Sequence, residues 1–301
     1  MINKNYGTRV YEFLAGYFQD NPQGFATYWA LWERHSAANL AGAHFVEEFT
    51  GGSKPKFMQR VWEMVLGQHL IACGHEITTR PEGQPDYRFE LGGRVVWVEA
   101  ISPEPGPDLP KEWTTYILPL PKFQVGTFPH KELLLRWTGA FKEKARKFCD
   151  YKTKGVVAPS DICVIAIDGS QLSKMPTTHG IPQVPFIVET VFPIGPLAIE
   201  VNRETGKLGS ATHTVQRMVE TRNQSPVYKE PFLRPEFSGI SVVLGAYGSS
   251  GLAGSLPLQV AYNPLAKSPL RPGRLGESAE EWGAKLVLKS DDEQEWDVFR
   301  F

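Results

Sequence analysis

The feature that most constrains the fold is the apolar segment VVWVEA at residues 95–100, which carries a glutamate near its end. Side chains alternate along a β-strand, so the side chains of residues 95–101 form two rows on opposite faces. The rows are Val95, Trp97, Glu99 and Ile101, and Val96, Val98 and Ala100. Both rows are mainly apolar, as in strands whose sheet is covered by helices on each face. The segment therefore predicts an α/β fold.

Helix and strand signals around this segment follow a definite order. Apolar residues at a 3.6-residue period predict an amphipathic helix over 56–74. Three strand candidates follow, at 75–80, 87–91 and 94–101. Gly92 and Gly93 separate the last two, as expected for a hairpin turn with positive φ. A helix at about 130–152 and an apolar strand at 162–168 complete the series helix, three strands, helix, strand.

The two ends of the chain differ in character. Residues 6–50 contain eleven aromatic residues, several at helical spacing, which predict two helices. Core packing explains these aromatics best, and a protein-docking surface is the alternative. The C-terminal half predicts short strands, including 185–192, with one helix at 211–222. We therefore expect a helical N-terminal segment (1–50), a core (51–180) and a β-rich C-terminal extension packed on the core (181–301).

Composition excludes several classes of protein. Three cysteines without CxxC spacing argue against a disulfide framework and a thiolate zinc site, and they favour a cytoplasmic location. The sequence has neither a signal-peptide h-region nor an apolar run long enough to cross a membrane. The formal net charge is −1, so a nucleic-acid site would need a local basic patch.

Glu99 needs a partner if its strand is buried. An unpaired carboxylate in an apolar layer costs several kcal/mol, so a basic side chain, a metal ion or an upward pKa shift is expected. Asp86 precedes the neighbouring strand and is close enough across the hairpin to share that partner. Because two carboxylates repel each other, a cation between them is the natural solution.

The spacing of these acids resembles a known family pattern. Pro85-Asp86 is followed, after twelve residues, by Glu99-Ala100, and the preceding helix carries Glu63 beside its apolar stripe. This resembles the PD-(D/E)XK nuclease superfamily, whose restriction-endonuclease-like core has the element order found here. The resemblance implies a mixed sheet flanked by helices. It also implies that Asp86 and Glu99 bind Mg²⁺ or Mn²⁺ and that Glu63 supports them.

The lysine of the family pattern is missing from its usual position, which is Ile101 here. Some members of the superfamily carry this lysine on the following helix instead. In this chain Lys144 falls in the middle of the apolar stripe of that helix, and we expect it to replace the missing lysine. The alternative is a lysine whose methylenes pack while its ammonium reaches water. Arg136 and Lys147 flank the stripe as reserves, and with Lys142 they are the expected substrate-binding residues.

The same helix supplies the local basic patch. Residues 131–154 contain eight Lys or Arg against three Asp or Glu, although such a run is also typical of a solvated helix face. A segment with seven prolines, at 102–130, precedes it and would shape substrate access or pack on the C-terminal half. The sequence thus predicts a metal-dependent nuclease acting on DNA rather than RNA. The alternatives are an inactive binding or scaffold protein of the same fold, or a component that needs a protein partner or a second copy through its aromatic N-terminal helices.

Overall fold

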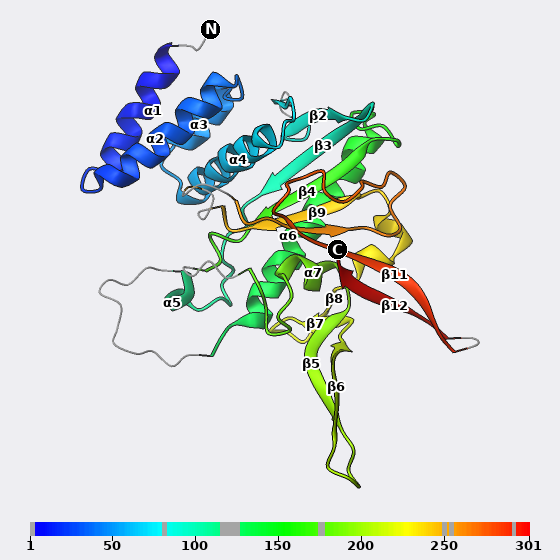
Figure 1. The fold of residues 1–301 in the computed structure, drawn as a ribbon. Helices are drawn as coiled ribbons and strands as arrows, with labels where there is room; N and C mark the ends of the chain where they lie inside the picture. The colour runs from blue at the N-terminus through cyan, green and yellow to red at the C-terminus, as the bar shows by residue number, and fades with distance from the viewer. Residues whose placement is uncertain are drawn as a thin grey trace.

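The computed structural model of the chain describes residues 4–79, 83–114, 127–173, 178–248, 252, 256–290 and 293–301. Within these residues it is an α/β protein with a large mixed β-sheet flanked by helices (Figure 1). The helices are α1 (Lys4–Tyr17), α2 (Pro22–Ala37), α3 (Ala43–Thr50), α4 (Lys54–Ala72), α5 (Lys111–Thr114), α6 (His130–Thr153) and α7 (Phe186–Val191). Two 3₁₀ turns, η1 (Pro231–Leu233) and η2 (Pro235–Phe237), precede the last strands.

The main sheet of the described residues has eight strands in the order β1-β2-β3-β4-β9-β10-β11-β12. They are β1 (Thr78–Thr79), β2 (Tyr87–Leu91), β3 (Arg94–Ile101), β4 (Ile162–Asp168), β9 (Val242–Ala246), β10 (Gln259–Tyr262), β11 (Glu280–Ser290) and β12 (Glu293–Arg300). The central strands β3, β4 and β9 run parallel, whereas β1 to β3 form an antiparallel meander. The carboxyl ends of β3, β4 and β9 therefore meet at one edge of the sheet.

Side chains of β3 point into two different apolar cores. Val96, Val98 and Ala100 pack with helices α1 to α4 on one face. Trp97 and Ile101 pack with α6 and α7 on the other. This confirms the alternation expected from the sequence. Helices on both faces bury the whole central sheet, which explains why β3 and β4 are apolar in both rows.

The turn between β2 and β3 brings the two acids of the motif together. Gly92 and Gly93 both have positive φ, 58° and 77°, as predicted for a primed hairpin turn. The strands pair antiparallel with Tyr87 opposite Val98. Asp86, one residue before Tyr87, is thereby placed beside the end of β3 that carries Glu99.

Three local expectations are wrong. The aromatic segment forms three helices, α1 to α3, where two were expected. Within residues 185–192, Phe186–Val191 form the buried helix α7 where a strand was expected. Residues 211–222 lie in strands β6 (Leu208–Val215) and β7 (Met218–Glu220) where a helix was expected.

Smaller sheets lie outside the main one. Strand β6 pairs with β5 (Ile194–Val201) in a hairpin that projects from the body of the molecule, and β7 pairs with β8 (Pro226–Tyr228) (Figure 1). Among the described residues, no helix is long and apolar enough to cross a membrane.

Candidate functional site

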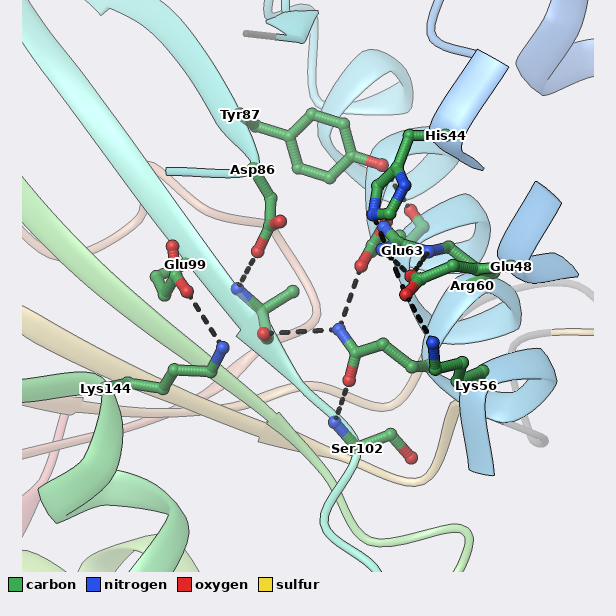
Figure 2. A network of polar contacts seen from close by, with 12 residues as sticks. His44, Glu48, Lys56, Arg60, Glu63, Asp86, Tyr87, Glu99, Ser102 and Lys144 are labelled. Carbon is green, nitrogen blue, oxygen red and sulfur yellow. Dashed lines mark hydrogen bonds and ion pairs between the residues drawn. The ribbon is translucent and has the colours of Figure 1, made fainter. Parts of the chain in front are cut away.

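Four side chains singled out from the sequence lie together where β2 begins and β3 ends. Glu63 comes from α4, Asp86 from the position just before β2, Glu99 from β3 and Lys144 from α6 (Figure 2). Helices α4 and α6 cover opposite faces of the sheet, so the site is assembled from both layers. The two helices contribute Glu63 and Lys144 because these side chains belong to their buried faces, which pack on the sheet.

Glu99 is held by three side chains of α6. The ammonium groups of Lys144 and Lys147 donate to its Oε1 at 2.8 and 3.0 Å, and the Tyr151 hydroxyl donates to Oε2 at 3.3 Å. Positions 144, 147 and 151 are one helical turn apart and share one face of α6. Glu99 and Lys144 are almost fully buried, with 2% and 7% of their side chains exposed, whereas Lys147 is 44% exposed.

The negative charge of Glu99 also raises the pKa values of two neighbouring side chains. Burial works against the positive charge of Lys147, but the carboxylate of Glu99 outweighs it and raises the lysine pKa. The pKa of Tyr151 is raised by burial and by the same carboxylate, which keeps the phenol protonated at neutral pH. Lys147 is therefore a cation at neutral pH and Tyr151 a neutral hydrogen-bond donor.

Asp86 lacks such a cationic partner. Its Oδ2 accepts a hydrogen bond of 2.7 Å from the backbone N–H of Ala100, and no basic residue that the structure describes forms an ion pair with it. Burial raises its pKa well above the ordinary 3.8, and the charges of Glu63 and Glu99 raise it further. Lys144 and the Ala100 N–H oppose this shift without cancelling it. A cation next to Asp86 would relieve the repulsion.

Glu63 is fixed by its own helix. The Gln59 side-chain amide donates to its Oε1 at 2.9 Å, and Arg60 forms an ion pair with its Oε2. Arg60 also pairs with Glu48 of α3, and together the two carboxylates raise the arginine pKa against the effect of burial. Glu63 is thus restrained beside the site, with its charge already matched.

Gln59 joins α4 to the end of β3. Its amide group donates a weak hydrogen bond of 3.3 Å to the carbonyl oxygen of Ala100. Its Oε1 accepts a hydrogen bond of 2.7 Å from the N–H of Ser102 (Figure 2). The sequence did not single out Gln59 or Arg60. Their position one helical turn before Glu63 was the available signal, but their other partners lie far away in the sequence.

A cavity and a groove adjoin the site on its two sides. The cavity, of about 300 Å³, is lined by Glu63, Asp86 and Glu99 together with Lys147 and Tyr151. The groove, of about 690 Å³, is lined by a set that includes Gln59, Ile101, Arg136 and Lys144. Two hydrogen bonds connect the groove to the cavity. Lys144 and Gln59 line the groove, and they donate to Glu99 and Glu63, which line the cavity.

The remaining predicted residues are dispersed. Arg136 lines the groove with Lys144 but not the acid cavity, and Lys147 joins Lys144 on Glu99. Lys142 lies near Arg234 and away from the acid cavity, and burial together with that arginine lowers its pKa. Part of the proline-rich segment, at 103–107, lines the groove, and its residues 115–126 lie outside the described chain.

Asp168 is a further buried acid at the same edge of the sheet. Its carboxylate accepts from the hydroxyl of Ser102, from the N–H and hydroxyl of Ser170, and from the N–H of Gly248. These bonds tie together the ends of β3, β4 and β9. Burial raises the pKa of Asp168, but its oxygens are already used by protein donors, which indicates a structural role.

The donor set suits a hard divalent cation held by few protein ligands. Within the described residues, no group of three His, Cys, Asp or Glu side chains is arranged to hold a metal ion. Mg²⁺, however, usually keeps several waters and takes only one or two carboxylates. Asp86 and Glu99 are two such carboxylates lining one cavity, and Asp86 has an unbalanced charge. Oxygen ligands of this kind fit Mg²⁺ or Mn²⁺.

Comparison with known proteins adds no further constraint. No family model, curated protein or solved structure matches the chain.

Proposed function

We propose that this chain is a metal-dependent nuclease of the PD-(D/E)XK type, with its lysine carried by α6. The observation that supports this best is the meeting of Asp86, Glu99 and Lys144 at one point, from two strands and a helix. The motif spacing pointed to Asp86 and Glu99, and the helical phase of the following helix pointed to Lys144. The order of elements from α4 to β4 supports a restriction-endonuclease-like core as part of the proposal.

The charges of the site suit a phosphate substrate. In the protein alone, Lys144 and Lys147 both pair with Glu99, whereas Asp86 has no ion pair among the described residues. A divalent cation on the two acids would leave the site positive and attractive to a phosphodiester, DNA being the expected polymer. The site thus needs the cation in order to attract its substrate.

Hydrolysis joins a water oxygen to phosphorus and breaks the bond from phosphorus to one sugar oxygen. Asp86 and Glu99 would hold the metal ion. When bound, Mg²⁺ or Mn²⁺ supplies Lewis-acid stabilisation of the charge that builds on the phosphate. Lys144, kept in place by Glu99, would orient the attacking water or donate to a phosphate oxygen. Glu63 positions the neighbouring backbone through Gln59, whose amide contacts Ala100.

One observation favours a second candidate, an inactive protein of this fold. Glu99 already has three donors, so its pairing with Lys144 and Lys147 could serve stability alone. Under that alternative the protein binds nucleic acid or a protein partner without cutting. The nuclease and the inactive candidate differ in the role of Asp86, which has no such set of donors.

A cleavage assay tests the proposal. Purified protein is incubated with plasmid, linear and single-stranded DNA and with RNA, in Mg²⁺, Mn²⁺ or EDTA. We expect cleavage only with the metals, and a loss of about 10²-fold or more in Asp86→Asn and Lys144→Met. Asp150→Asn, which changes an exposed aspartate on α6, should cleave like the wild type. Cleavage that survives EDTA or the Asp86→Asn change would refute the proposal, and folded protein that never cleaves would favour the inactive alternative.

A further inference from the structure

The groove beside Lys144 has features of a binding site that the proposed chemistry does not use. One wall is a face of α6 formed by Arg136, Gly139, Ala140 and Lys144. A second wall includes residues 103–107 of the proline-rich segment, and the lining also contains Lys56 and the two acids Glu104 and Glu143. Gly139 and Ala140 have little or no side chain, so they leave space between these walls.

Arg136 is available for a ligand in this groove. Its aliphatic stem packs against the backbone of Gly106, where an added Cβ would lie 3.2 Å from the arginine Cδ. Its buried Nε has no hydrogen-bond partner among the residues that the structure describes. A buried N–H without a partner is costly, and a guanidinium group suits bidentate binding of phosphate oxygens.

The position of Lys144 limits what can occupy the groove. Lys144 lines the groove, yet only 7% of its side chain is exposed. A duplex presents its phosphates on the outside of a wide rod, which the walls at α6 and 103–107 would hold away from this lysine. A single strand can enter between the walls, with its phosphates on Arg136 and its sugars and bases against proline rings.

We propose that the groove binds a single strand of nucleic acid beside Lys144, next to the acid cavity. This inference rests on the proposed function, because it assigns that site a single-stranded substrate region. Arg136 is the phosphate-binding residue of the groove, and Gly139 provides the space for the strand. The contact between Lys144 and Glu99 lies between the groove and the acid cavity.

Two variants test the groove by different physical effects. Arg136→Gln removes the charge. Gly139→Leu fills the groove, because a Cβ at this position has nothing within 4 Å, and leucine is a better helix former than glycine. The control is Arg146→Gln, which removes an exposed arginine from the same helix.

The measurement is fluorescence anisotropy of labelled oligothymidine, and of a labelled duplex of equal length, in EDTA over a range of salt concentrations. We expect the single strand to bind more tightly. Arg136→Gln should weaken it about tenfold and reduce the slope of log K against log salt by about 0.7, the value for one phosphate contact on a single strand. Gly139→Leu should weaken binding without lowering thermal stability, and the Arg146→Gln control should bind like the wild type.

Equal affinity for the duplex, or unchanged binding in both Arg136→Gln and Gly139→Leu, would overturn the inference. Because the assay contains no metal, its outcome is independent of cleavage. Normal groove binding without any cleavage would count against the nuclease proposal alone. Cleavage that is unaffected by the groove variants would count against the groove alone.

Discussion

Asp86 differs from the other acids of the site in its surroundings. Glu63 and Glu99 each have a basic partner, whereas Asp86 accepts one backbone hydrogen bond and is repelled by both carboxylates. Its raised pKa means that the folded protein binds more protons than the unfolded chain above pH 3.8. The free energy of unfolding should therefore fall as the pH rises from 3.8 through the folded-state pKa.

Replacing Asp86 by asparagine should stabilise the metal-free protein. The amide oxygen of the introduced asparagine can still accept from the Ala100 N–H, but the side chain carries no charge to be repelled. We expect Asp86→Asn to raise the unfolding temperature at pH 7 in EDTA by roughly 2–4 °C and to remove the local pH dependence. Thermal unfolding between pH 4 and 8 measures this. Asp150→Asn is the control, and an equal or lower unfolding temperature for Asp86→Asn would show that the repulsion is absent.

At the scale of elements, the proposed site takes its lysine from helix α6, where the PD-(D/E)XK pattern has it on a strand. Ile101 lies on the same face of β3 as Glu99 and lines the same groove as Lys144. A lysine introduced at position 101 would therefore extend from the same face of β3 as Glu99 and point toward the groove that Lys144 lines. The two positions should be interchangeable in part.

A rescue experiment tests this equivalence. Lys144→Met should reduce metal-dependent cleavage by about 10²-fold. Adding Ile101→Lys to that variant should restore part of the rate, whereas adding Ile101→Met should restore none. Initial rates on the best substrate, with circular dichroism to verify folding, give the comparison. If Ile101→Lys leaves the rate at the level of the single variant, Lys144 acts through the geometry of α6 rather than through its charge near Glu99.

Elements with strong periodicity could be predicted from the sequence, and those with local ambiguity could not. The burial rows of β3 and the stripe of α6 each repeat over several residues, which made their faces readable. Residues 185–192 form a short apolar run, and such runs do not distinguish a buried helix from a strand by periodicity. Residues 211–222 combine a helix-like spacing with β-branched residues that favour the strands β6 and β7.

Only some residues of the candidate site could be predicted from the sequence. Asp86, Glu99 and Lys144 were found because spacing and helical phase depend on local sequence. Gln59 and Arg60 were missed because what defines them is contact with Ser102 and Glu48, which no local pattern reveals. Lys142 lies near Arg234, a residue 92 positions away in the chain, which helical phase alone could not predict.

At the scale of the whole molecule, the N-terminal helices and the β5–β6 hairpin contribute differently. Helices α1 to α3 share one apolar core with α4 and the sheet, and Glu48 of α3 pairs with Arg60 beside the site. The hairpin leaves both strands exposed beyond its first residues and projects from the body (Figure 1). Helices α1 to α3 are therefore integral to the core, whereas the β5–β6 hairpin is not.

Two deletions should therefore have opposite results. Removal of residues 1–50 exposes the core-facing side of α4, and we expect insoluble or unfolded protein. Replacement of residues 197–213 by a two-residue Asn-Gly turn should leave a folded protein with nearly unchanged unfolding temperature and cleavage. Solubility, circular dichroism and thermal unfolding measure both. A stable, folded protein without residues 1–50 would show that these helices form a separate unit.

The most direct test of the account is titration of the metal-free protein with Mn²⁺, followed by the electron paramagnetic resonance signal of the free ion. We predict saturable binding that Mg²⁺ competes for and that Asp86→Asn abolishes, while Asp150→Asn binds normally. Absence of saturable binding by the folded wild type, or unchanged binding by Asp86→Asn, would contradict the claim that Asp86 and Glu99 form a metal site.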